Sequence, residues 1–260
     1  MTVVAYNRAL MKPRVLRYES LPSTNTEIAR LAGEGAEEGL AVVADEQTAG
    51  RGRLQRAWSS PKGAGLYFSI LLRPKLASDR WPLITFVAAL ATGDALLEAA
   101  SVQTDIKWPN DLLANERKIC GILAEAIETP TGRAVVLGIG INLTNQAFPD
   151  ELINLATSVA NESGRPAERE AILAALLQAL ARWYSLLQEP DGAEKIAAAW
   201  SSRSSWATGR LVQVTNGAET LQGHTRGIEN DGALRLETAQ GIQLIRAGDV
   251  TSVRPARMSV

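Results

Sequence analysis

Residues 50–69 read Gly50-Arg51-Gly52-Arg53-Leu54-Gln55-Arg56-Ala57-Trp58-Ser59-Ser60-Pro61-Lys62-Gly63-Ala64-Gly65-Leu66-Tyr67-Phe68-Ser69. The first part is too charged and too rich in glycine for the interior of an element, which predicts a mobile loop. Arginine binds phosphate or carboxylate through two parallel hydrogen bonds, and glycine lets the backbone approach a ligand closely. A solvated basic loop would explain any single arginine but not the whole block. The block therefore predicts an anion-binding loop that leads into a buried strand over 66–72.

A second block places cations beside oxygen ligands. It consists of Lys107-Trp108-Pro109-Asn110-Asp111-Leu112, followed by Lys118-Ile119-Cys120-Gly121-Ile122-Leu123. A lysine that ends one strand and another that opens a later strand should meet at a sheet edge, and Asn and Asp suit Mg²⁺ that bridges to phosphates. An ordinary hairpin turn is the alternative, since Asn-Asp is common in turns, but it does not account for the lysines.

Composition excludes several classes of protein. Cys120 is the only cysteine and His224 the only histidine, so an intramolecular disulfide and zinc sites with several histidines are excluded. A Ser-His-Asp triad would need His224, which lies in a glycine-rich stretch and is more simply a structural residue. There is no P-loop, and Gln55 stands where a G-x-G-x-x-G motif needs glycine. The net charge of −1 argues against a DNA-binding surface.

The remaining sequence predicts an α+β fold with an all-β module. Thr24 to Glu27 resembles a capping box that starts a helix, and Pro82 to Ala100 predicts a buried helix, not a membrane span. A long amphipathic helix is expected over 172–187, followed by a shorter one through Ile196 and Trp200. Other strands are expected over 40–44, 105–108, 112–114, 119–127, 134–143, 234–237 and 242–245.

These elements suggest three parts: a lead-in over 1–16, a catalytic domain over 17–205 and a small barrel over 206–260. Met1 to Arg17 lacks the apolar region of a signal peptide, so we expect a cytoplasmic protein that does not bind membranes.

The ordered motifs together resemble the biotin–protein ligase (biotin–[acetyl-CoA-carboxylase] ligase) family over residues 17–260. Besides the two blocks, the resemblance rests on Ser23-Thr24-Asn25, Gln47 and Gly138-Ile139-Gly140-Ile141-Asn142. It implies a mixed β-sheet flanked by helices, as in class II aminoacyl-tRNA synthetases, with a small C-terminal SH3-like β-barrel. It also implies an enzyme that forms biotinyl-5′-AMP from biotin and MgATP. The enzyme then transfers biotin to a lysine of the biotin carboxyl carrier protein of acetyl-CoA carboxylase. ATP, Mg²⁺ and biotin enter as substrates, and no permanently bound cofactor is expected.

The resemblance also implies residue roles. Catalysis falls to Lys118, Arg53 and Arg51. Biotin binding falls to Ser23, Thr24, Asn25, Gln47, Gly50, Arg51, Gly52, Arg53, Gly65, Leu66, Tyr67, Lys118, Gly121 and Leu123. ATP binding falls to Arg56, Trp58, Lys107, Asn110, Asp111 and Asn142, with Asp111 also the candidate ligand of Mg²⁺. Trp58 is expected either to cover the nucleotide or to anchor the loop.

Two departures from the family pattern are visible. Gln55 replaces a glycine common after the Gly-Arg-Gly-Arg run, which predicts a stiffer loop. Only about sixteen residues precede the catalytic region, which predicts a form without the DNA-binding domain. The alternatives are a lipoate or octanoate ligase or transferase of the same fold, and a non-catalytic carrier-binding module. The second of these would predict losses in the cationic loop or at Lys118, and neither is seen. A homodimer is compatible with the resemblance.

Overall fold

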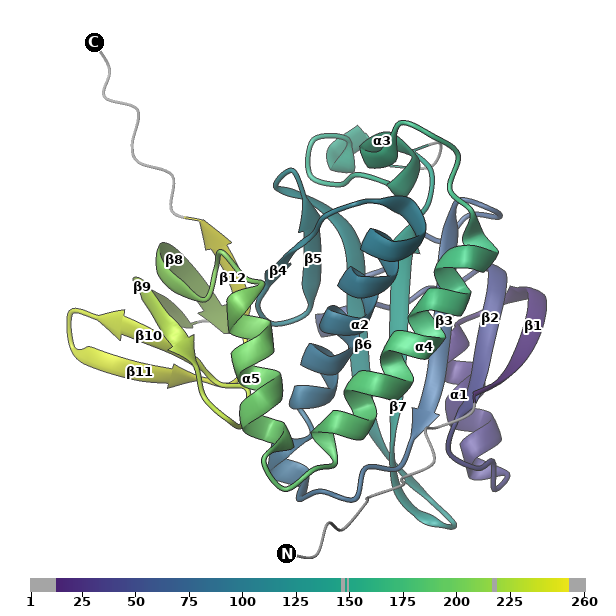
Figure 1. Ribbon diagram of the computed structural model, residues 1–260, viewed down its shortest axis with the longest axis horizontal. Coiled ribbons are helices and arrows are strands. Elements are labelled where there is room, and N and C mark those ends of the chain that lie inside the picture. The colour runs from purple at the N-terminus through teal and green to yellow at the C-terminus, as the bar shows by residue number, and fades with distance from the viewer. Residues whose placement is uncertain (1–12, 146–147, 149, 217–218, 253–260) are drawn as a thin grey trace, which may run out of the picture.

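The computed structural model describes residues 13–145, 148, 150–216 and 219–252, and its centre is a seven-stranded mixed sheet (Figure 1). Only the pair β1–β2 is parallel, and every other neighbouring pair is antiparallel. In spatial order the strands are β1 (Arg14–Leu21), β2 (Leu40–Gln47), β3 (Gly65–Leu72), β7 (Gly132–Asn142), β6 (Arg117–Thr129), β5 (Asp111–Ala114) and β4 (Asp105–Lys107).

Helices cover both faces of this sheet. Helix α1 (Thr24–Gly33) packs on one face, and α2 (Leu83–Ala100), α4 (Arg169–Leu187) and α5 (Gly192–Ser202) lie on the other (Figure 1). The ring of Phe86 in α2 stacks on Trp200 in α5, with centroids 4.7 Å apart. Two segments, Ser78–Ala100 and Arg169–Leu187, are long and apolar enough to cross a membrane, but 67% and 50% of their apolar windows are buried. Their apolar character is therefore accounted for by packing in the core.

The side chains of β3 point alternately to the two faces of the sheet, and this alternation decides on which face the site lies. Leu66, Phe68, Ile70 and Leu72 point into the core beneath α2, because alternate side chains of a strand share a face. The residues between them, Tyr67 and Ser69, consequently face α1. The cavity described below opens on this second face.

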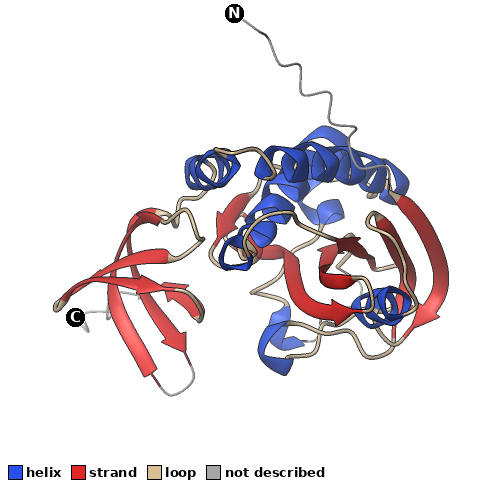
Figure 2. Cartoon of the chain, turned by 90° about the horizontal axis from the view of Figure 1, so that it is seen from below, coloured by secondary structure: helices blue, strands red, loops and turns tan. Residues whose placement is uncertain are grey.

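A separate antiparallel sheet of five strands, in the order β11-β10-β9-β8-β12, forms the C-terminal module (Figure 2). Its strands are β8 (Thr208–Asn216), β9 (Glu219–Ile228), β10 (Leu234–Thr238), β11 (Gly241–Ile245) and β12 (Asp249–Ser252). Its apolar face joins the main core through residues such as Leu236, and Trp108 Nε1 donates to Gly232 O at 3.0 Å. The predicted fold class, a mixed sheet flanked by helices with a small all-β module, is confirmed.

Three sequence expectations need correction. Strand β1 begins at Arg14, so residues 14–16 belong to the sheet and not to a lead-in, whereas residues 1–12 and 253–260 lie outside the described residues. The short helix α3 (Val159–Ser163) was not predicted. The capping box is wrong: Ser23 is the N-cap, and the Glu27 carboxylate accepts from Tyr18 and Arg30 instead of a backbone N–H. The Thr24 hydroxyl does not cap the helix and instead hydrogen-bonds Gln47.

Candidate active site

The floor of the site consists of two rows of residues that run across β3, β7 and β6. One row is Ser69–Gly138–Leu123 and the other is Tyr67–Gly140–Gly121, as the strand registers show. The middle strand has glycine in both rows, so no side chain fills the centre of the sheet surface. A hollow therefore opens between α1 and the loop over residues 50–61.

Asn25 occupies the space above Gly138. A Cβ at Gly138 would come within 2.2 Å of Asn25 Oδ1, much closer than atoms approach without bonding. Asn25 is 4% exposed, accepts from Ser69 Oγ at 2.6 Å and donates to Glu125 Oε2 at 2.7 Å. The glycine is thus required so that Asn25 can lie flat on the sheet.

Thr24 and Gln47 extend this polar network toward the loop. Gln47 Oε1 accepts from both the backbone N–H and the hydroxyl of Thr24, at 2.9 and 3.1 Å. Gln47 Nε2 donates to Ser60 Oγ at 2.8 Å. Thr24, Asn25 and Gln47 thus offer neutral donors and acceptors to the cavity, while the Glu125 carboxylate behind them is paired with Arg51. Such a wall suits a polar but uncharged ligand group.

Trp58 lies above the second glycine row. Cβ atoms at Gly140 and Gly121 would come within 2.6 and 2.8 Å of its indole ring. Its Nε1 is buried without a hydrogen-bond partner among the described residues, and Lys118 Nζ is 5.3 Å from the ring centroid. The loop reaches this position by folding on itself, since Gly52 N–H donates to Arg56 O and Trp58 N–H to Gly50 O. Trp58 therefore anchors the loop and also presents its ring to the cavity.

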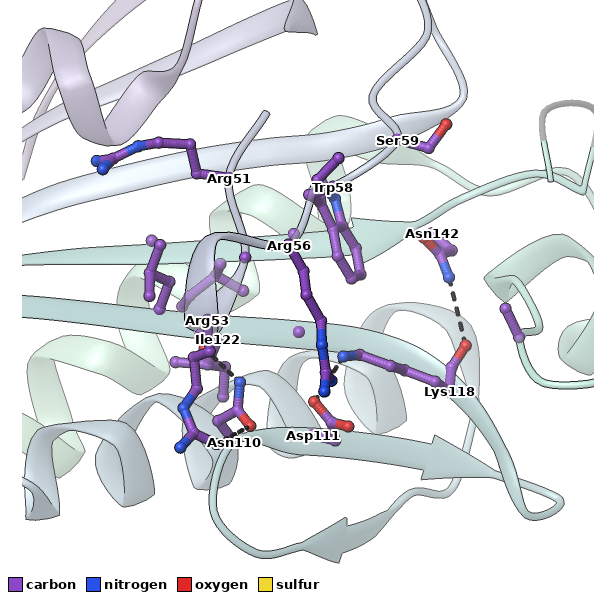
Figure 3. Close-up of a pocket in the computed structure, with 18 of the residues that line it drawn as sticks. Arg51, Arg53, Arg56, Trp58, Ser59, Asn110, Asp111, Lys118, Ile122 and Asn142 are labelled. Carbon is purple, nitrogen blue, oxygen red and sulfur yellow. Dashed lines mark hydrogen bonds and ion pairs between the residues drawn. The ribbon is translucent and has the colours of Figure 1, made fainter. Parts of the chain in front are cut away.

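The loop arginines diverge (Figure 3). Arg51 reaches Glu125 at 2.7 Å, next to the Asn25 network, and points away from the other cations. Arg53 lies on the opposite side and donates to Asn110 Oδ1 at 3.2 Å and to Gly248 O at 3.3 Å. Arg53 and Arg56 both reach the Asp249 carboxylate, at 3.5 and 2.5 Å. The C-terminal module thus supplies an anion to the loop.

Gln55 bears on the shape of this loop. Leu54 and Gln55 have φ of 53° and 60°, in the left-handed region. A glycine adopts that conformation without steric cost, whereas another residue loses about 1 kcal/mol or more. The replacement of glycine by Gln55 therefore places strain in the turn of the loop.

Lys118 forms the centre of the cationic end. Its Nζ is 2.7 Å from Asp111 Oδ1. Its backbone carbonyl accepts from Thr157 N–H at 2.9 Å and from Asn142 Nδ2 at 3.3 Å (Figure 3). Asn142 Nδ2 also donates to Thr157 O at 3.0 Å. The amide group of Asn142, predicted to bind ATP, thus donates to the backbone on both sides and fixes the Lys118 backbone.

Asn110 has a similar double role. Asn110 Nδ2 donates to Ile122 O at 2.7 Å, and the backbone carbonyl of Asn110 accepts from Ile122 N–H at 3.0 Å. These bonds join the turn before β5 to β6, while Oδ1 receives Arg53. Asn110 therefore fixes the geometry through which the loop meets the sheet.

Lys107 differs from the other cavity cations. Among the described residues it has no ion pair, and its Nζ lies 4.8 Å from the ring centroid of Trp206. Burial lowers the pKa of Lys107, because a desolvated ammonium is less stable than a hydrated one. The Asp111 and Asp249 carboxylates oppose this shift from beyond ion-pair distance.

Most of these groups line one cavity of about 740 Å³, while Ser69 and Glu125 lie behind its wall and hydrogen-bond Asn25. It brings together every predicted site residue except Gly50, Gly65 and Leu66. Leu66 points into the core, and Cβ atoms at Gly50 and Gly65 would clash with Trp58 O and the Tyr67 ring at 2.4 Å. These three residues shape the backbone and do not face the cavity.

Ser69, Glu125 and Asp249 belong to the site but were not predicted as site residues. Glu125 could have been found, because it shares a strand face with Gly121 and Leu123. Asp249 carries no signal in sequence, since it reaches the loop only through the packing of the C-terminal module.

Few of the described side chains in the site could act as ligands of a metal ion. No cluster of three or more Asp, Glu, His or Cys side chains that could hold a metal occurs in the described part of the chain. Magnesium that arrives with a nucleotide keeps several waters and needs only one or two protein carboxylates. Asp111 fits that requirement as a single carboxylate beside Lys118.

Comparison with known proteins gives two family matches. The pattern of the biotin/lipoate A/B protein ligase family matches residues 18–142, and that of the biotin protein ligase C terminal domain matches residues 208–251. The chain is 38% identical over 245 residues to the bifunctional ligase/repressor BirA of Bacillus subtilis, covering 93% of this chain and 74% of that protein. It is also 38% identical to the biotin–[acetyl-CoA-carboxylase] ligase of Paracoccus denitrificans, covering 88% of this chain and 96% of that one.

Among solved structures, the biotin protein ligase from Aquifex aeolicus in complex with biotin and ATP is similar to this chain. The TM-score is 0.80 and the identity 29%, over 93% of this chain and 99% of that one.

Proposed function

Because the chain belongs to the biotin/lipoate A/B protein ligase family, we propose that its cavity joins biotin to ATP through the residues described above. The chain is an ATP-dependent biotin–protein ligase, and its relatives do not favour the lipoate or octanoate alternative. The proposal concerns which residues perform each task.

The observation that carries this assignment is the chemical division of one cavity. At the α1 end, Thr24, Asn25 and Gln47 form a neutral hydrogen-bonding wall. At the other end, Lys107 and Lys118 lie beside Arg53 and Arg56. The uncharged ureido ring of biotin fits the neutral side chains at the α1 end, and the triphosphate of ATP fits the cations at the other end. The carboxylate of biotin would then point toward the cations, where the two anionic reactants must meet.

The first step forms a bond between a biotin carboxylate oxygen and the α-phosphorus of ATP, while the bond to the leaving pyrophosphate breaks. Two anions repel one another, so cations must hold both within reacting distance. Lys118 is the group that we assign to the carboxylate and the adjoining phosphoryl oxygens, because Asn142 fixes its backbone at the junction of the two ends. Trp58 is assigned to the base, since its ring faces the cavity over two glycines.

The magnesium of MgATP would meet Asp111, and there it would offset negative charge on the phosphates. Because Asp111 already pairs with Lys118, the approach of the nucleotide would release Lys118 toward the reacting oxygens. In the second step, an acceptor lysine amine attacks the acyl carbon of the anhydride and AMP leaves. Closure of the loop excludes water from this anhydride in the meantime.

We assign the catalytic role to residues 17–205, with residues 206–260 as a second domain. The acceptor is proposed to be the biotin carboxyl carrier protein of acetyl-CoA carboxylase, since acetyl-CoA carboxylase is the target named for the Paracoccus relative. Such a reaction takes place in the cytoplasm, and a homodimer remains compatible with it.

Transfer to that carrier tests the proposal. The protein is incubated with MgATP, the isolated carrier domain and either biotin, lipoate or octanoate, and the mass of the carrier is measured. We expect the mass of one biotinyl group to be added with biotin only. Addition of a lipoyl or octanoyl group without biotinylation would contradict the proposed substrate.

Two glycine substitutions should separate the two ends of the cavity. Gly138→Ala should displace Asn25 and raise the KM for biotin about tenfold, with little change for ATP. Gly140→Ala should displace Trp58 and raise the KM for ATP by a similar factor, with little change for biotin. Initial rates of pyrophosphate release would measure both constants.

Gly33→Ala is the matched control, since a Cβ there has no neighbour within 4 Å and should leave both constants unchanged. If Gly138→Ala and Gly140→Ala raised the same constant, the assignment of biotin and nucleotide to opposite ends would be wrong.

A further inference from the structure

The C-terminal module reaches the nucleotide end of the cavity through Trp206. This residue does not line the cavity itself, but it lies behind Lys107, which does. Trp206 is 6% exposed. Its ring contacts two cations: Lys107 Nζ lies 4.8 Å and Arg210 Cζ 3.7 Å from the ring centroid. The ring is therefore part of a small cationic stack at the junction of the two sheets.

The segment before Trp206 is bonded along the free edge of β4. Arg203 O accepts from Ile106 N–H at 3.2 Å, and Ser204 Oγ donates to Ile106 O at 2.6 Å. Ser205 N–H and Oγ both donate to the Asp105 carboxylate, at 2.7 and 2.6 Å. These bonds fix the segment at the edge of β4. Trp206, which follows the segment, turns its ring toward Lys107, whose Nζ lies 4.8 Å from the ring centroid.

The kind of contact matters for the charge on Lys107. The other cations that line the cavity pair with carboxylates: Arg51 with Glu125, Arg53 and Arg56 with Asp249, and Lys118 with Asp111. Among the described residues, Lys107 forms no ion pair: its Nζ lies on the face of Trp206, and the Asp111 and Asp249 carboxylates attract it only from a longer distance. A ring attracts an ammonium through its quadrupole but carries no net charge. The ring therefore holds the ammonium in place without neutralising its charge.

We propose that Trp206 is a positioning residue that holds the Lys107 ammonium for the β- and γ-phosphates of ATP. This inference rests on the proposed function and adds a task for the C-terminal module. Removal of the ring leaves Lys107 with more rotamers and less stabilisation of its buried charge, so triphosphate binding weakens. The biotin end, which Trp206 does not approach, should be unaffected.

Trp206→Leu and Trp206→Phe test the inference in the full chain. With pyrophosphate release as the readout, Trp206→Leu should raise the KM for ATP about tenfold and leave the KM for biotin unchanged. Trp206→Phe keeps an aromatic face and should stay within about threefold of the wild type. Trp81→Leu is the matched control, because Trp81 also carries an arginine, Arg133 at 4.7 Å, but lies outside the cavity lining and outside the segment that leads to Trp206.

A double-mutant cycle with Lys107→Met separates positioning from general loss of structure. If Trp206 acts through Lys107, Trp206→Leu should add no further loss in the Lys107→Met background. Independent, additive losses would overturn the inference, as would equal losses in the Leu and Phe variants or a parallel rise in the KM for biotin. Thermal melting accompanies each variant. Trp206→Met, whose unbranched and flexible side chain adapts better to the vacated space, replaces Trp206→Leu if the latter melts below the assay temperature.

The two levels of the proposal fail differently. Wild-type protein without biotin-dependent pyrophosphate release would overturn the proposed function. Normal release in the wild type, with an unchanged KM for ATP in Trp206→Leu, would overturn only the role of Trp206.

Discussion

Replacement of Lys118 by methionine should slow adenylate formation by about 10²–10³-fold, the usual loss when one preorganised charge donor is removed from a reacting centre. Two changes act together. The ammonium that offsets charge on the reacting oxygens disappears, and the Asp111 carboxylate loses its partner at 2.7 Å. An unpaired carboxylate at that point repels phosphate. The rate is measured as biotin-dependent pyrophosphate release at saturating biotin and ATP.

Lys118→Arg separates these contributions, because arginine keeps the charge but not the compact ammonium geometry. We expect it to recover part of the rate. Lys195→Met, which removes an exposed lysine paired with Glu189 and Asp191, should retain the full rate. A Lys118→Met protein that stays folded and forms the adenylate at the wild-type rate would show that Lys118 takes no part in the first step.

The second large effect is expected for Arg53→Gly. This variant loses the bonds from the loop to Asn110, Gly248 and Asp249. A hydrogen bond to a charged group contributes about 1.5–3 kcal/mol, so escape of the intermediate should quicken by about 10- to 100-fold. Synthesis of the adenylate should persist, because Lys118 and Lys107 remain. The experiment measures free biotinyl-5′-AMP in the filtrate over time.

Lys62→Gly is the control for added backbone freedom, since Lys62 follows the loop but does not line the cavity. It should retain the intermediate as the wild type does. Equal retention by Arg53→Gly would mean that the loop contacts to Asn110 and Asp249 do not guard the adenylate.

The predictability of the fold follows from where each element obtains its stability. Strand β3 and helix α2 have patterns dictated by burial, and both were placed from sequence to within a residue or two. Strand β1 was not predicted from the sequence. It is an edge strand with one hydrogen-bonded neighbour and a half-exposed pattern, so its pairing with β2 decides its conformation. Helix α3 has only five residues, too few to show a helical period.

The site residues also differ in whether the sequence alone could identify them. Residues in ordered motifs, such as Lys118 and Gln47, were identified because they stand at matching places in the family pattern, and both line the cavity. Asp249 and Trp206 escaped because their contacts with Arg56 and Lys107 arise from docking of a module far along the chain. Polar residues at a helix start were also misread as caps, since Thr24 in a capping pattern looks the same whether it bonds the helix or Gln47. Tertiary contacts decide such cases.

Release of pyrophosphate from ATP, in the absence of any carrier protein, tests the central claim most directly. The wild-type protein is assayed with MgATP and increasing biotin, lipoate or octanoate. The arrangement of a neutral wall beside Lys107 and Lys118 predicts release that saturates with biotin and stays at background with the other two acids. Release that depends on lipoate or octanoate and not on biotin would contradict it.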